Sequence, residues 1–153
     1  LDWLAGMADN GARSYANNTA IVQAVGRGEV PMGLVNHYYN FRALAEDSGA
    51  ASRNYYFPNG DIGSVLIATG AGIVAGSDQP ELGGRLIEFL LGETAQRYLA
   101  EETFEYPLGL GSEPVDVLPA LTTIDAAFHD LDELGGGLER TKELIDASGL
   151  ESP

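Results

Sequence analysis

Two adjacent tyrosines, Tyr38 and Tyr39, are the residues whose type and spacing are best suited to chemistry. A deprotonated phenol is a hard, anionic oxygen donor, but a free tyrosine ionises only at a pH of about 10. A bound cation supplies a positive charge that favours ionisation. The pair is therefore a candidate ligand set for a hard, highly charged ion such as ferric iron. The alternative is a pair of half-buried aromatic side chains whose hydroxyl groups form hydrogen bonds.

A strand, a turn and a helix must position these two phenols. The apolar run that ends at Val35 predicts a strand over residues 29–35, and the pattern over residues 40–47 predicts a helix. Open α/β proteins place their ligands at the carboxyl ends of such strands. Neighbouring residues of an extended strand point to opposite faces. Both phenols can therefore reach one site only if the backbone turns at Asn36 and His37.

A second polar cluster, Asn17-Asn18-Thr19, precedes an apolar helical pattern over residues 20–25. Asn and Thr are typical N-cap residues, and Gly26 and Gly28 are expected to end the helix. The free backbone amides at a helix start can bind an anion. The alternative is that this segment is an ordinary helix cap.

The rest of the chain predicts further strands and helices. Strands are expected over residues 64–68 and 72–75, and helices over residues 1–8, from Pro80 with Asp78 as its cap, over residues 93–101 and over residues 138–147. Glycines at 70, 72 and 76 resemble a dinucleotide-binding turn. That turn should open a helix directly, whereas the next helix is expected only at Pro80, so nucleotide binding is the weaker interpretation.

Composition narrows the class of protein. The 153 residues suit one domain, 44% of them are hydrophobic, and no apolar run is long enough to span a membrane. A formal net charge of −15 argues against nucleic acid as a partner, because binding to its backbone requires Lys and Arg. The absence of cysteine excludes disulfides, thiolate zinc sites and cysteine nucleophiles. His37 and His129 are the only histidines, and since no catalytic motif is present, we do not expect an enzyme.

Several motifs in a fixed order resemble one family, the ferric-ion-binding substrate-binding proteins of bacterial ABC transporters. The resemblance runs from about Trp3 to about Leu150 and concerns the carboxyl-terminal half of that family. The motifs that carry it are Tyr15-Ala16-Asn17-Asn18-Thr19-Ala20, Gly28-Glu29-Val30, Leu34-Val35-Asn36-His37-Tyr38-Tyr39, Gly70-Ala71-Gly72, Phe89-Leu90, Ala95-Gln96-Arg97 and Glu105-Tyr106-Pro107-Leu108.

The resemblance implies an α/β fold of the periplasmic-binding-protein type II class, with the ligand in a cleft between two lobes. Residues 1–66 are then expected to belong to lobe two and to carry the ligand tyrosines. Residues 67–117 would be a return segment of lobe one, and residues 118–153 would supply the last helices of lobe two. The chain would thus hold most of lobe two and part of lobe one.

The resemblance also implies roles for individual residues. Tyr38 and Tyr39 would be the phenolate ligands of Fe(III), which is the cargo. Asn18 and Asn36 would hold a synergistic anion, such as phosphate or carbonate, that completes the coordination. His37 is not a usual ligand in the family, and it would lie either beside the ligands or on the surface. The expected partner is an ABC transporter permease, and the expected location is periplasmic or extracellular, with a lipoprotein anchor as one option.

The family's amino-terminal half has no counterpart in this sequence, so we expect a fragment with exposed apolar edges that self-associates. Two rival functions stay open at this stage. One is a binding protein of the same fold for another cargo, such as an organic cation, a polyol phosphate or an oxyanion. The other is a nucleotide-dependent enzyme that uses residues 70–76.

Overall fold

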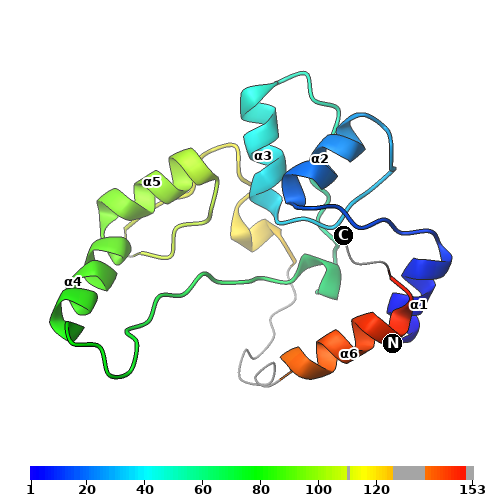
Figure 1. Ribbon diagram of the computed structural model, residues 1–153. Coiled ribbons are helices and arrows are strands. Elements are labelled where there is room, and N and C mark those ends of the chain that lie inside the picture. The colour runs from blue at the N-terminus through cyan, green and yellow to red at the C-terminus, as the bar shows by residue number, and fades with distance from the viewer. Residues whose placement is uncertain (110, 126–136, 151–153) are drawn as a thin grey trace.

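The computed structural model describes residues 1–109, 111–125 and 137–150, and in this part of the chain the regular structure is helical (Figure 1). His129 lies outside the described residues. The elements are α1 (Asp2–Asp9), α2 (Asn18–Gly26), α3 (His37–Glu46), the short 3-10 helix η1 (Ile62–Ser64), α4 (Pro80–Leu91), α5 (Glu93–Thr103), the 3-10 helix η2 (Leu121–Thr123) and α6 (Leu138–Ser148).

The helices pack in pairs. α1 lies against α6, α2 against α3, and α4 against α5. In Figure 1 the α4–α5 pair stands apart from the other two pairs, and a long extended connector leads to it from η1. Contact between α1 and α6 brings the beginning and the end of the described chain together.

The three predicted strands, over residues 29–35, 64–68 and 72–75, are not formed. Within the described residues no β-strand is assigned, and Val65 alone has an isolated bridge. A strand requires a neighbouring segment to accept and donate its backbone hydrogen bonds. These segments instead expose the apolar side chains that suggested burial: Ile67 is 76% exposed and Val74 is 79% exposed. The expected α/β class is therefore only partly supported: the fold comparison given below agrees with the expected family fold, but the described residues form none of the predicted strands.

One predicted helix start and one predicted cap were also wrong, whereas α4 does begin at Pro80 as predicted. The tyrosine helix begins at His37 and not at Asn40, so Tyr38 and Tyr39 lie in its first turn and not in a preceding loop. α4 is preceded by Gln79 in the N-cap position, with no side-chain cap from Asp78. The predicted cap of α2 is confirmed, since the Asn17 Oδ1 accepts a hydrogen bond of 2.9 Å from the backbone N–H of Ala20.

The buried interior of the described chain is small. The hydrophobic residues in it are Val22, Ala24, Ala95, Ala100 and Leu118. The accessible surface is 11374 Å², whereas a compact monomer of 16.2 kDa is expected to expose about 7,500 Å². Many large apolar side chains are exposed, so this chain presents surface that a compact globular protein would bury.

One buried polar group fixes the segment that follows α5. The Gln96 side chain accepts hydrogen bonds from the backbone N–H groups of Leu108 (2.8 Å) and Gly109 (2.9 Å), and donates one to the Leu90 carbonyl (2.8 Å). This amide therefore ties residues 108–109 to the α4–α5 pair.

Among the described residues, no helix is long and apolar enough to cross a membrane.

Candidate metal site

The two phenols lie side by side at the start of α3. The ring centroids of Tyr38 and Tyr39 are 4.6 Å apart, with an angle of 33° between the ring planes. Helical side chains lean toward the helix N-terminus, so both rings extend over the residues that lead into α3. The Asn36 side-chain amide donates a hydrogen bond of 3.2 Å to the Tyr38 hydroxyl. The structure thus brings Asn36 and both tyrosines together.

Asn18 joins the same cluster from α2. Its Oδ1 accepts a hydrogen bond of 3.3 Å from the backbone N–H of Asn36. This contact places the start of α2 beside the start of α3, and the two helices contact each other. All four predicted site residues are therefore grouped where two helix N-termini meet, and such termini carry partial positive charge and unpaired N–H groups.

In the absence of a cation, the surroundings of Tyr38 favour its neutral form. Burial raises the pKa of Tyr38 above its ordinary value of 10.0, and the hydrogen bond with Tyr39 raises it further, while the hydrogen bond from Asn36 opposes both effects. The carboxylate of Glu105 also contributes to the raised pKa of Tyr38. At neutral pH the Tyr38 phenol therefore keeps its proton until a strong positive charge arrives.

His37 lies next to the phenols, and the sequence did not predict its environment. Its Nε2 is 2.9 Å from the carbonyl oxygen of Phe104, at the end of α5. Burial lowers the pKa of His37, although the hydrogen bond to Phe104 opposes this effect. The His37 and Tyr106 ring centroids are only 5.2 Å apart. The family motif that contains Tyr106 was therefore the one signal in the sequence that could have indicated a neighbour of His37.

Two other segments take no part in the contacts of this cluster. Tyr55 is exposed, and its ring meets the Phe57 ring edge-on, with centroids 5.1 Å apart. Residues 70–76 lie in the extended connector (Figure 1) and open no helix, so they lack the geometry of a dinucleotide-binding turn.

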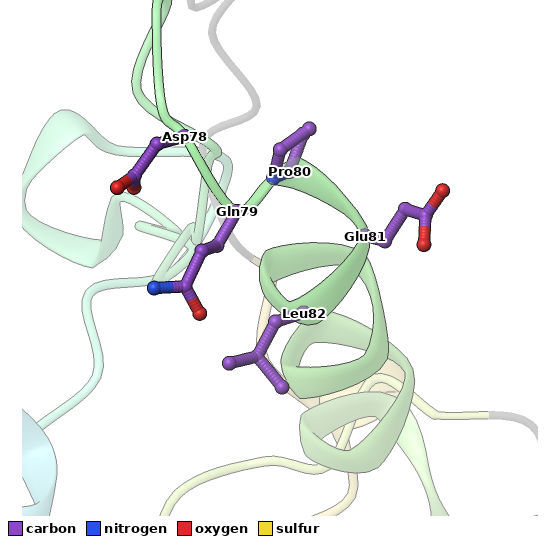
Figure 2. A pocket seen from close by; sticks show the side chains of 5 residues that line it. All are labelled: Asp78, Gln79, Pro80, Glu81 and Leu82. Carbon is purple, nitrogen blue, oxygen red and sulfur yellow. The ribbon is translucent and has the colours of Figure 1, made fainter.

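A hollow of about 390 Å³ lies at the start of α4 and is lined by Asp78, Gln79, Pro80, Glu81 and Leu82. Figure 2 shows that the carboxylates of Asp78 and Glu81 point to opposite sides of the helix start. They therefore form no common ligand set.

Within the described residues, no group of three or more His, Cys, Asp or Glu side chains could hold a metal ion. The donors that the site offers are consequently the two phenol oxygens, with the amides of Asn18 and Asn36 beside them. Two hard oxygens do not fill the coordination sphere of a hard cation. Any such ion must take further ligands from an anion, from water or from another protein surface.

Comparison with known proteins gives a consistent class. No protein-family model matches the chain. The chain is 31% identical over 154 residues to the Fe(3+)-binding periplasmic protein of Serratia marcescens, covering 98% of this chain and 44% of that one. It is 31% identical to iron uptake protein A1 of Synechocystis, covering 97% and 43%. The crystal structure of iron-bound HitA from Pseudomonas aeruginosa superposes with a TM-score of 0.86 at 31% identity, covering 97% of this chain and 48% of that one.

These matches confirm the resemblance to ferric-ion-binding proteins over nearly all of this chain. They also show that the chain spans less than half the length of the relatives it matches. The local fold is that of the matching part of HitA, even though the described residues form no strand of their own.

Proposed function

We propose that this chain is the ferric-ion-capturing part of a substrate-binding protein for an ABC importer. Tyr38 and Tyr39 bind Fe(III) as phenolates, and Asn18 and Asn36 hold a synergistic anion such as phosphate or carbonate. The observation that carries the proposal is the pairing of the two phenol rings at 4.6 Å beside two helix N-termini. The names of the relatives, which describe Fe(3+) binding and iron uptake, support the same cargo.

The proposed protein transports its cargo and catalyses no reaction. Residues 1–66 and 118–153 form lobe two, and residues 67–117 belong to lobe one. Packing of α1 on α6 supports the first grouping, and the separate position of the α4–α5 pair supports the second (Figure 1). The partner is a transporter permease, and the location is periplasmic or extracellular, with a lipoprotein anchor as one form of attachment.

The test is a visible absorption spectrum after addition of ferric citrate. Wild type is compared with Tyr38→Phe/Tyr39→Phe and with the control Tyr55→Phe, which removes one exposed phenol outside the cluster. We expect a broad phenolate-to-iron band in wild type and control, and none in the double variant. The band should weaken as pH falls, because iron binding must displace the phenol protons.

An absence of this band in wild type would contradict the ferric assignment. The same would follow from a band of equal strength in the double variant. Binding of a polyol phosphate or an oxyanion that survives loss of both phenols would instead identify a binding protein of this fold for another cargo.

A further inference from the structure

His37 connects the first turn of α3 to the end of α5. Its ring Nε2 lies 2.9 Å from the Phe104 carbonyl oxygen, and its own backbone carbonyl accepts a hydrogen bond of 3.0 Å from the Asn54 side chain. A carbonyl oxygen can only accept, so the Nε2 must carry the proton in this contact. The residue before Tyr38 is therefore held at both its ring and its backbone.

The His37 ring also contacts the candidate ligand directly. It meets the Tyr38 ring edge-on, with centroids 5.6 Å apart. On another side it lies 5.2 Å from the ring of Tyr106, whose hydroxyl donates a hydrogen bond of 2.6 Å to the Pro119 carbonyl. The His37 ring therefore bridges Tyr38 and a second anchored aromatic side chain.

The acceptor of the His37 hydrogen bond is itself fixed. Phe104 ends α5 in the left-handed conformation, at φ 58°. The Phe104 ring stacks on Phe41 of α3, with centroids 6.1 Å apart, and the next backbone N–H, that of Glu105, bonds to the Leu99 carbonyl at 3.2 Å. A non-glycine residue keeps this conformation only when its surroundings hold it there. The carbonyl is thus a stable reference point for α3.

We propose that His37 is a positioning residue that sets the orientation of the Tyr38 phenol toward bound iron by tying the start of α3 to the Phe104 carbonyl. The inference rests on the proposed function, since it assigns Tyr38 as an iron ligand. Groups that orient metal ligands without touching the metal change metal affinity by about 10–100-fold when they are replaced. His37 acts through Tyr38 in this way and does not itself coordinate the ion.

The experiment compares His37→Leu, which fills the space without a hydrogen-bond donor, with His37→Gln, which keeps a side-chain N–H. Tyr55→Phe, which removes an exposed tyrosine hydroxyl outside the cluster, is the unrelated control. The first readout is the ring spectrum of ¹³C-labelled tyrosine in the metal-free protein, with the Tyr38 signals assigned by Tyr38→Phe. The second is the rate of iron release to a chelator, and thermal unfolding is followed for every variant.

We expect His37→Leu to shift the Tyr38 ring signals and to release iron about tenfold faster. His37→Gln should recover most of both properties, and the control should match wild type. The proposal is overturned if a folded His37→Leu protein keeps the wild-type Tyr38 signals. It is also overturned if His37→Leu and His37→Gln are altered equally and unfold at equally lowered temperatures, because that pattern indicates packing alone.

Failure of the proposed function would look different. A wild-type protein without any tyrosine-dependent iron band would remove Tyr38 as a ligand and would overturn the role of His37 toward iron. The metal-free tyrosine spectra would then still show whether His37 orients the Tyr38 ring.

Discussion

Self-association is the prediction that follows most directly from the surface of this chain. α4 exposes large apolar side chains, among them Leu86 and Phe89, which are 57% and 59% exposed. Such a face on a soluble protein marks an interaction surface. We predict that the isolated chain forms dimers or larger species, and that Leu86→Glu/Phe89→Glu weakens them without unfolding α4, since glutamate is a good helix former.

The surface areas set the size of this effect. The chain exposes 11374 Å², which exceeds the roughly 7,500 Å² of a compact monomer by about 3,900 Å². Stable obligate interfaces bury about 2,000–5,000 Å², so covering this excess is enough for tight association. Covering each half-exposed side chain contributes about 1.5 kcal/mol. Two charges in place of Leu86 and Phe89 should therefore raise the dissociation constant about a hundredfold.

Sedimentation velocity across a range of protein concentrations measures this constant. The control is Asn10→Asp/Gln23→Glu, which adds the same two negative charges at exposed positions of another region. It should associate like wild type, apart from a small electrostatic effect that salt removes. A wild-type chain that stays monomeric at every concentration would refute the reasoning. Equal weakening in the control would show that net charge, not the α4 face, governs association.

Two further predictions concern packing and pH. A Cβ on Gly33 would overlap the Ile21 Cγ2 methyl, so Gly33→Ala should lower the free energy of unfolding by about 1–3 kcal/mol in urea titrations. Gly26→Ala, where a Cβ meets nothing within 4 Å, is the matched control. Equal free energies of unfolding for the two variants would contradict the overlap. Burial raises the pKa of Tyr106 to about 12. The stability that its neutral phenol gives the folded protein should therefore be fully present below a pH of about 10, and should be lost as the pH rises toward 12. Tyr106→Phe should lower the free energy of unfolding by about 1 kcal/mol at pH 8, because the hydrogen bond to the Pro119 carbonyl is lost. The variant should also lose less stability than wild type between pH 8 and 11, as measured by urea unfolding curves at both values. An equal loss in wild type and variant would contradict the role given to Tyr106.

The helices were predictable because their signals are local. The Asn17 cap, the terminating glycines and the apolar stripe of α4 each depend on residues within one or two turns, and α2 and α4 lie where they were expected. Asn36 is a favoured N-cap residue and occupies the N-cap position of α3. The start of α3 was nevertheless misplaced, because His37 and the two tyrosines that follow have only weak helix propensity. Its position is set by contacts from outside the helix, chiefly the Asn18 bond and the Phe104 bond.

The predicted strands failed because a strand forms only when a second segment pairs with it. An apolar run such as residues 64–68 indicates that a segment is suited to burial. Whether it forms a strand depends on a partner segment, which is often distant in the sequence. The grouping of Asn18, Asn36 and the tyrosines was predictable only through the family resemblance. The contact between His37 and Phe104 joins residues 67 positions apart, and no local pattern encodes it.

Charge balance at the proposed site explains why an anion belongs to it. Fe(III) with two phenolates keeps one positive charge, and the two helix N-termini beside Asn18 and Asn36 add about half a charge each. Roughly two units of positive charge thus remain. Among the described residues, no cationic side chain is one of the groups that shift the pKa of Tyr38. Phosphate or carbonate carries one to two negative charges at neutral pH and matches the unpaired amides at these helix starts. Loss of that anion should therefore weaken iron retention even when both phenols are intact.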